Sequence, residues 1–337
     1  MYAGLEGGFE VAIIGSIQEK EKQTIGESVI LKRARQTPWL AYLGLTLTAL
    51  FWAGNAVVGR SVVDTIPPLS LSFYRWTIAL CILLPLGLPG VWRQRHVVLA
   101  HKWSLLLLSA LSVGAFNTLL YLSALSTTAL NISLVASTIP IMIAFLAWLI
   151  LGDRLRLPQT LGIVLAMLGI LVVISRGDWA TLTELNFHLG DVIMIAAVSC
   201  WGLFSVLLRR QAVPLEPIAF LTVQVALGVL VILPFYLVDL LFISGGFIVD
   251  ATVVPPLAYV AIFPGLLAYA FWNNGVHTIG PSRAAIFMYL SPIFTAILAG
   301  LFLGERMSIF YIAGGALILA GLQLTTRRRP IHPAAVP

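Results

Sequence analysis

The stretch Leu151-Gly152-Asp153-Arg154 returns, 152 residues further along the chain, as Leu303-Gly304-Glu305-Arg306. Each copy closes an apolar run, and other residues repeat at the same spacing or, nearer the start of each half, at a spacing of 149. These equivalent pairs are Pro140 and Pro292, Gly162 and Gly314, Gly169 and Gly321, and Trp52 and Trp201. Internal repeats determine the architecture before any single residue does, and here they indicate a chain built from two similar halves.

The composition places most of the chain in lipid. Of its 337 residues, 59% are hydrophobic and 10% are charged, and the mean hydropathy is +0.98. Soluble domains carry about 25% charged residues, so a soluble protein of this composition could not cover its surface with polar groups. The net charge of +6 would suggest nucleic acid in a soluble chain, but here the basic residues lie mainly at the ends of apolar runs. We therefore expect membrane lipid, and no nucleic acid, as a partner.

Ten apolar runs follow a polar N-terminal segment. They are 39–58, 69–89, 103–125, 130–151, 160–174, 191–208, 217–238, 255–276, 284–303 and 309–325. A membrane-spanning helix needs about 20 residues, so we predict an all-α membrane protein with ten transmembrane helices. Five helices per half is an odd number. The second half must therefore enter the membrane in the opposite orientation, as in the inverted repeats of secondary transporters.

The predicted organisation has four parts: a polar cytoplasmic tail at 1–38, a first five-helix repeat at 39–176, a second at 177–326 and a cytoplasmic tail at 327–337. Lys and Arg set the orientation because they accumulate on the cytoplasmic side. With the N-terminus inside, 16 of the 20 basic residues lie inside and three lie outside: Arg60, Arg176 and Arg306. Both termini are therefore expected to be cytoplasmic. We expect a multi-pass protein of the plasma membrane, which is the inner membrane in a Gram-negative cell.

Four short motifs in the apolar runs carry a family resemblance. They are Phe51-Trp52-Ala53-Gly54-Asn55, Tyr74-Arg75-Trp76, Ser137-Thr138-Ile139-Pro140 and Tyr289-Leu290-Ser291-Pro292. Together with the two halves, they resemble the EamA domains of the drug/metabolite transporter superfamily across residues 39–325. The resemblance implies a transporter of small metabolites, with a central cavity bordered by the first, third, fourth, sixth, eighth and ninth helices. It does not distinguish amino acids, amines, sugars or other metabolites as the substrate.

Polar residues inside the apolar runs are the first candidates for substrate binding, because polar groups in hydrocarbon are costly. Asn117 and Tyr121 are four residues apart and so share one helix face. The repeat spacing maps them onto Tyr269 and Asn273, with the amide and the phenol exchanged. Two facing helices would then line a cavity. The alternative is hydrogen bonding between helices that only stabilises the fold.

Trp52 and Asn55 in the first helix and Trp201 in the sixth are the other candidates for substrate binding. Trp201 lies near the middle of its run, away from the interfaces where Trp usually gathers. It forms either a wall of the cavity or ordinary packing. Trp272, Asn274 and Tyr289 are further residues of the same kind.

Arg75, Pro140 and Pro292 are candidates for a gate or hinge. Arg75 is the one full charge well inside an apolar run. It either clamps backbone carbonyls or Asp64, or acts as a gate or as a contact to a substrate carboxylate. Pro140 and Pro292 lie within the fourth and ninth runs, where proline would kink a helix. The two bends would flex during transport or would shape the cavity without moving.

These residues favour a membrane transporter that exports or exchanges small metabolites such as amino acids by alternating access. All 14 acidic residues lie in tails, loops or span ends, which argues against proton coupling through a carboxylate at mid-membrane. The alternatives are a channel or facilitator for another class of small solute, and a membrane sensor that transports nothing.

We do not expect an enzyme. The sequence contains no HExxH zinc motif and no Walker lysine, so we predict no catalytic residue, no metal and no cofactor. The expected partners are a small-molecule substrate and membrane lipid. Glycines 162, 169, 314 and 321 allow close helix contact, either within the chain or across the interface of a homodimer.

Overall fold

The computed structural model describes residues 38–62, 65–124, 126–127, 132, 135–153, 155–175, 178, 188–303 and 309–326. The predicted tail at 1–38, except for Pro38, and the tail at 327–337 lie outside this part of the chain. Arg154 and Gly304-Glu305-Arg306, from the two copies of the repeated motif, lie outside it as well.

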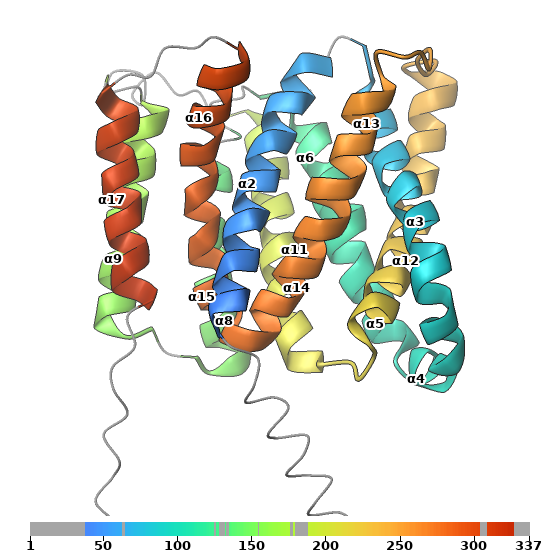
Figure 1. Ribbon diagram of the computed structural model, residues 1–337, viewed down its shortest axis with the longest axis horizontal. Helices are drawn as coiled ribbons and strands as arrows, with labels where there is room; N and C mark the ends of the chain where they lie inside the picture. Colours follow the sequence, from blue (N-terminus) through green and yellow to red (C-terminus); the bar gives the residue numbers. More distant parts are fainter. Residues whose placement is uncertain are drawn as a thin grey trace, which may run out of the picture.

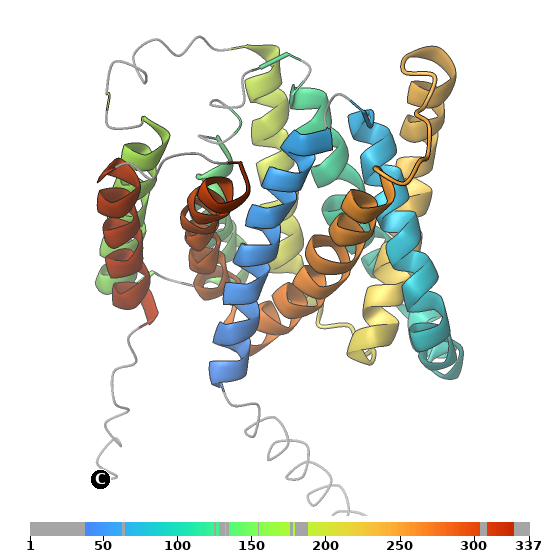
Figure 2. The ribbon, with the colours of Figure 1, turned by 45° about the horizontal axis from the view of Figure 1, so that its top comes forward.

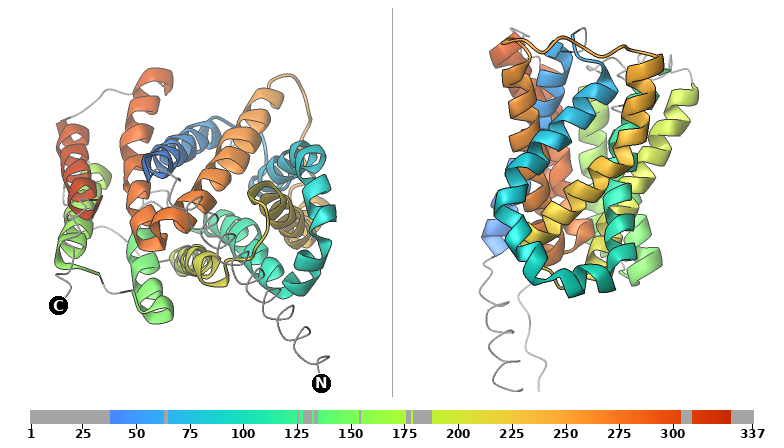
Figure 3. Two further views of the ribbon diagram at one scale, coloured as in Figure 1. Left: turned by 60° about the horizontal axis from the view of Figure 1, so that its bottom comes forward. Right: turned by 90° about the vertical axis from the view of Figure 1, so that its right-hand side faces the viewer.

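Helices make up the fold, and no strand occurs among the described residues. They stand side by side and run between two faces of the molecule (Figures 1 and 3). In chain order, the elements of the first half are α2 (Pro38–Val62), α3 (Pro68–Arg93), α4 (Arg95–Ala100), α5 (Lys102–Ser109), η1 (Ala110–Phe116), α6 (Asn117–Ala124), α8 (Ile139–Leu151) and α9 (Leu157–Ile174). Those of the second half are α11 (Leu189–Gln211), α12 (Pro217–Phe242), α13 (Val254–Val260), η2 (Ala261–Leu267), α14 (Ala268–Ile279), α15 (Pro281–Ile286), η3 (Phe287–Leu290), α16 (Ser291–Leu303) and α17 (Ile309–Thr326).

Within the described part of the chain, five helical stretches are long and apolar enough to cross a membrane: Pro68–Arg93, Lys102–Leu120, Leu189–Gln211, Pro217–Phe242 and Val254–Ile279. Shorter apolar helices accompany them at Ile139–Leu151, Leu157–Val173 and Ile312–Leu324. Large apolar side chains such as Trp103, Leu157 and Leu241 are mostly exposed, as expected where lipid is the solvent. The predicted all-helical class is confirmed and agrees with a membrane protein. The count of ten spans and the side of the termini stay predictions.

A short π-helical segment interrupts each of two long helices. The segment η1 lies between α5 and α6, and η2 lies between α13 and α14. Such segments occur mostly as single turns inside α-helices, frequently at functional sites. Asn117 is the first residue after η1, and Tyr269 is the second residue after η2. Two predicted site residues are therefore presented at equivalent places, where the helix changes its winding.

The structure corrects the expected positions of the two prolines. Pro140 is the second residue of α8, after a turn at residues 137–138, and Pro292 is the second residue of α16, after the 3-10 segment η3. Proline is tolerated in the first turn of a helix because its missing N–H would have no partner there. Each proline therefore begins a helical segment instead of kinking the middle of one.

Helices α9 and α17 form a closely packed pair at one edge of the bundle (Figures 1 and 2). A Cβ placed on Gly169 would lie 2.6 Å from the backbone oxygen of Gly314, and one on Gly321 would collide with the backbone oxygen of Gly162. The spacing of 152 residues converts the first contact into the second. The glycines therefore serve packing within the chain, and a homodimer is not needed to explain them.

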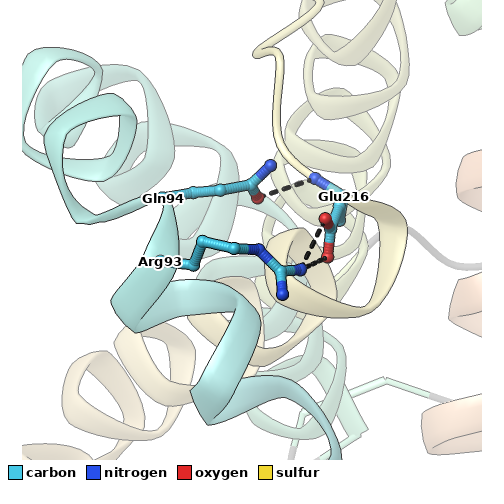
Figure 4. A network of polar contacts seen from close by, with 3 residues as sticks. All are labelled: Arg93, Gln94 and Glu216. Atoms are coloured by element: carbon cyan, nitrogen blue, oxygen red, sulfur yellow. Dashed lines mark hydrogen bonds and ion pairs between the residues drawn. The ribbon is translucent and has the colours of Figure 1, made fainter.

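At one end of the bundle, polar contacts join α3 to α12 (Figure 4). The Arg93 guanidinium donates to both carboxylate oxygens of Glu216, at 2.6 and 2.7 Å. The backbone N–H of Glu216 donates to the side-chain oxygen of Gln94 at 3.1 Å. Glu216 directly precedes α12, so these contacts fasten the end of a first-half helix to the start of a second-half helix.

Gly169→Ala is expected to destabilise the protein by about 1–3 kcal/mol, because the new methyl group overpacks the contact with α17. Gly315→Ala is the matched control, since a Cβ there meets only the Ile293 side chain at 3.8 Å. Unfolding in detergent micelles measures both changes. Equal stability of the two variants would contradict the close contact between α9 and α17.

Arg93→Ala is expected to lower the free energy of unfolding by less than about 1 kcal/mol, because both partners of the ion pair are solvent-exposed. The cost should shrink as salt screens the charges. Unfolding at low and high ionic strength checks this, with Gln94→Ala as the uncharged comparison that shows no salt dependence. A salt-independent loss of several kcal/mol would mean that the pair is desolvated in the membrane-embedded protein.

Candidate functional site

Helix α14 packs against both α2 and α11, and these helices lie toward the middle of the bundle in Figure 1. One tryptophan from each of the three helices contacts the other two. The ring centroids of Trp52 and Trp201 are 5.4 Å apart, those of Trp52 and Trp272 are 5.6 Å apart, and those of Trp201 and Trp272 are 5.5 Å apart. Such distances are typical of edge-to-face and tilted aromatic pairs. Tyr269 and Trp76 extend this group, with their own centroids 4.7 Å apart. We call Trp52, Trp76, Trp201, Tyr269 and Trp272 the central aromatic cluster.

The structure thus brings together Trp52 and Trp201, which the repeat spacing relates to each other. The Trp52 indole N–H donates to the backbone oxygen of Pro264 at 3.3 Å, within the π-helical segment η2. The rings of Trp201 and Trp272 are almost fully buried, and their indole N–H groups have no partner among the described residues. Buried indoles usually find a hydrogen-bond partner. These two donors are therefore left unsatisfied within the described part of the chain.

Asn117 and Tyr269, which the repeat spacing relates to each other, also lie close together. The Asn117 amide nitrogen lies 3.5 Å from the Tyr269 hydroxyl oxygen, which is a long contact. Both side chains share a firmer partner, because the amide and the hydroxyl each donate to the backbone oxygen of Ser112 at 3.2 Å. That carbonyl belongs to η1. The third and eighth helical stretches are therefore tied together across the middle of the molecule.

Gln224 of α12 completes this arrangement, although it is not among the site residues predicted from the sequence. Its amide oxygen accepts from the Asn273 amide at 2.9 Å, and its amide nitrogen donates to the Ser112 hydroxyl at 2.9 Å. Gln224 is fully buried. A signal was present, since an amide inside the long apolar run of α12 needs a reason. We call Ser112, Asn117, Gln224, Tyr269 and Asn273 the central polar network.

Other candidates lie apart from this centre. Asn55 is partly buried on α2, and no hydrogen bond among the described side chains joins it to the other predicted residues. Asn274 is exposed, although its neighbour Asn273 is buried. Tyr289 packs in a separate core with residues of α8, α9 and α17. Tyr121 lies on α6, and its side chain is outside the described part of the chain.

Arg75 borders the central aromatic cluster. Its side chain is 4% exposed, and its guanidinium carbon lies 4.9 Å from the centroid of the Trp76 ring. This is a cation–π contact, which attracts a cation to the face of an indole. The guanidinium Nε has no partner among the described residues. Asp64, one of the partners considered for it, lies outside them.

The groups that meet at this centre are hydrogen-bonding side chains and aromatic rings. The polar network contains amides, a phenol and a serine whose hydroxyl donates to the backbone oxygen of Leu108. None of these groups is an activated nucleophile. No group of His, Cys, Asp and Glu among the described residues could hold a metal ion. Amides, indoles and a guanidinium hold a polar solute by hydrogen bonds, while the ring faces contact its apolar part.

Gln224→Met is expected to lose about 0.6 kcal/mol of coupling with Asn273, and at most about 1.7 kcal/mol, the average and the maximum for hydrogen bonds between membrane helices. A double-mutant cycle with Asn273→Leu, read by unfolding in detergent, isolates that coupling. Thr222→Val is the control, because the Thr222 hydroxyl donates only within its own helix, to the backbone oxygen of Ile218. Coupling as large for Thr222 as for Gln224 would show that the cycle reports general packing.

Comparisons with known proteins find several transporters that are similar to this chain. A transporter YyaM of Bacillus subtilis, named uncharacterized, is 26% identical over 283 residues, covering 83% of this chain and 92% of its own. A probable amino-acid metabolite efflux pump of Salmonella typhimurium is 27% identical, covering 82% and 92%. A probable terminal-alkyne amino-acid exporter of Streptantibioticus cattleyicolor is 24% identical, covering 86% and 94%.

A solved structure shares the fold, with a TM-score of 0.72 and 20% sequence identity over 85% of this chain and 96% of its own. The sequence pattern of the EamA-like transporter family matches this chain twice, at residues 39–175 and 188–327. These two matches cover most of the chain and confirm the family resemblance seen in the motifs. The chain therefore belongs to the EamA-like transporter family.

Proposed function

We propose that this protein is a carrier that exports or exchanges small metabolites such as amino acids by alternating access between two inverted five-helix repeats. The observation that carries the proposal is that equivalent residues contact each other, Trp52 with Trp201 and Asn117 near Tyr269. A residue touches its own equivalent only on a two-fold axis. Such an axis in the membrane plane is what lets two inverted halves exchange their inward-open and outward-open conformations.

Three further features support the inverted repeat. The glycine contacts between α9 and α17 exchange under the repeat spacing, and they are antiparallel, since Gly162 meets Gly321 and Gly169 meets Gly314. The π-helical segments η1 and η2 lie at equivalent places. The family pattern matches once in each half. We therefore propose the repeats at 39–176 and 177–326, ten spans, cytoplasmic tails at 1–38 and 327–337, and the plasma membrane as the location.

The burial of the central rings favours a carrier over a channel. Trp201, Trp272 and Trp76 are at most 1% exposed, and they fill the middle of the bundle. A channel needs a continuous open path, whereas a carrier closes its centre as it changes from one conformation to the other. Membership of a transporter family points away from an enzyme.

The substrate class follows from the site and from the relatives. Two relatives are named for amino-acid metabolites or amino acids. Every member of the central polar network is uncharged at neutral pH, and the Arg75 cation lies beside the cluster. Neutral amides and one cation suit a zwitterionic solute. The absence of a carboxylate within this network favours exchange over coupling to protons.

Counterflow of labelled amino acids into liposomes that contain the purified protein tests the function. We expect accelerated, saturable exchange. Tyr269→Phe removes one hydroxyl of the network and should reduce exchange about tenfold, the equivalent of one lost hydrogen bond. Trp201→Phe should reduce it as well, because the ring contacts change, and Asn117→Ala should abolish it.

Two variants serve as matched controls in this experiment. Tyr289→Phe removes a buried hydroxyl outside the central polar network, and Trp148→Phe changes a tryptophan that is 52% exposed on α8. Both should exchange normally. Flux that rises linearly with concentration and shows no counterflow would indicate a channel. Exchange of amines or sugars, but of no amino acid, would contradict the proposed substrate class and would still support a carrier.

A further inference from the structure

Arg75 is the one buried basic side chain of the described residues, and no ion pair with a described carboxylate neutralises its charge. Its contact with the Trp76 ring offsets part of the cost of burial. A ring face, however, does not satisfy the N–H donors of the guanidinium, which point outward in its plane. An unpaired charge in hydrocarbon is costly, and intramembrane cations are usually paired or functional.

The acidic residues of the described part are engaged elsewhere or lie at the surface. Asp191 accepts from the Thr127 hydroxyl and the His188 backbone, and Asp239 accepts from the Ser244 hydroxyl. The other acids of this part are exposed. They are Asp153, Asp178, Glu216, which pairs with Arg93, and Asp250, whose pKa is lowered by the hydrogen bond from the Thr252 hydroxyl. Among the described residues, therefore, no carboxylate neutralises Arg75.

Two ring contacts place Arg75 beside the proposed binding site. The Trp76 ring lies under its guanidinium, and the same ring packs edge-on against Tyr269. Tyr269 belongs to both the central aromatic cluster and the central polar network. A solute held at this centre therefore lies close to a dry guanidinium on one side and against indole faces on the other.

We propose that Arg75 binds the carboxylate of the transported solute, so that the substrates are carboxylic acids with an apolar portion, amino acids included. A guanidinium fork matches a carboxylate with two parallel hydrogen bonds, which become stronger away from water. The apolar portion lies against the rings of the central aromatic cluster. This inference rests on the proposed function and adds the group of the solute that is recognised.

The bound carboxylate also pairs with the charge of Arg75. In the empty site no carboxylate of the described residues pairs with the guanidinium, whereas in the loaded site the carboxylate of the solute does. Burying a paired charge during the conformational change is less costly than burying an unpaired one. The loaded carrier therefore changes conformation more readily than the empty one, which favours exchange over net transport.

Binding to the purified full-length protein, measured by the quenching of tryptophan fluorescence, tests the inference with two series of probes. One series is leucine, 4-methylpentanoate and 3-methylbutylamine, and the other is phenylalanine, 3-phenylpropionate and phenethylamine. In each series, the second compound lacks the amine and the third lacks the carboxylate. We expect the first two compounds of a series to bind and the amine to bind at least tenfold more weakly.

Arg75→Gln is expected to weaken binding of the carboxylates at least tenfold and to leave the weak binding of the amines unchanged. Arg75→Lys keeps the positive charge but not the two parallel donors of the guanidinium, and should weaken carboxylate binding less than Arg75→Gln does. Arg93→Gln is the matched control, because Arg93 lies on the same helix but pairs with Glu216 at the surface. Asp64→Asn tests the structural alternative, a clamp between Arg75 and Asp64, and should leave binding unchanged.

The outcomes separate this inference from the carrier function. Equal binding of acids and amines, no binding of any carboxylate, or unchanged binding in Arg75→Gln would overturn the carboxylate role and leave the carrier function standing. Asp64→Asn behaving like Arg75→Gln, with acids and amines weakened equally, would assign Arg75 to the structural clamp and overturn the inference. Selective loss of the carboxylates without any counterflow in the wild-type protein would support the inference and contradict the carrier function.

Discussion

Hydrocarbon offers no hydrogen-bond partners, so each polar group of a membrane-embedded helix must find one within the chain. Several serines and threonines meet this constraint locally. Thr48, Ser109 and Ser205 each donate to the backbone oxygen four residues earlier on their own helix. Other side chains reach across to a neighbouring helix. Gln224 does this by joining Asn273 to Ser112, and in doing so it fixes how α12 lies against η1 and α14.

The same constraint explains why the π-helical segments matter. A segment with wider winding releases a carbonyl from the regular ladder of the helix. In η2 the oxygen of Pro264 accepts from Trp52, and in η1 the oxygen of Ser112 accepts from Asn117 and Tyr269. Irregular backbone at membrane depth is tolerated where it is buried in protein. Here it anchors the aromatic and polar groups that form the candidate site.

Much of the fold and part of the site could be predicted from the sequence. Apolar runs predicted the helices, and the repeat spacing related Asn117 to Tyr269 and Trp52 to Trp201, two pairs that the structure then brings close together. Gln224 and Ser112 were not predicted as site residues, because their role depends on which helices pack together. No spacing along the chain encodes that packing. The π-helical segments were not predicted, because they change the winding of the helix without changing the apolar pattern of the sequence. Pro140 and Pro292 were placed in helix interiors because an apolar run does not reveal where a helix restarts inside it.

The contact between Asn117 and Tyr269 has a consequence for how two halves of one chain can diverge. If two identical subunits once formed the proposed axis, a residue on it faced a copy of itself, and any change altered both sides at once. When one gene encodes both halves, a position on the axis can change without a change in its equivalent. Trp52 and Trp201 still present the same ring to each other, whereas Asn117 and Tyr269 present an amide to a phenol. The asymmetric pair is the kind of interface that a duplicated gene can acquire and a symmetric dimer cannot.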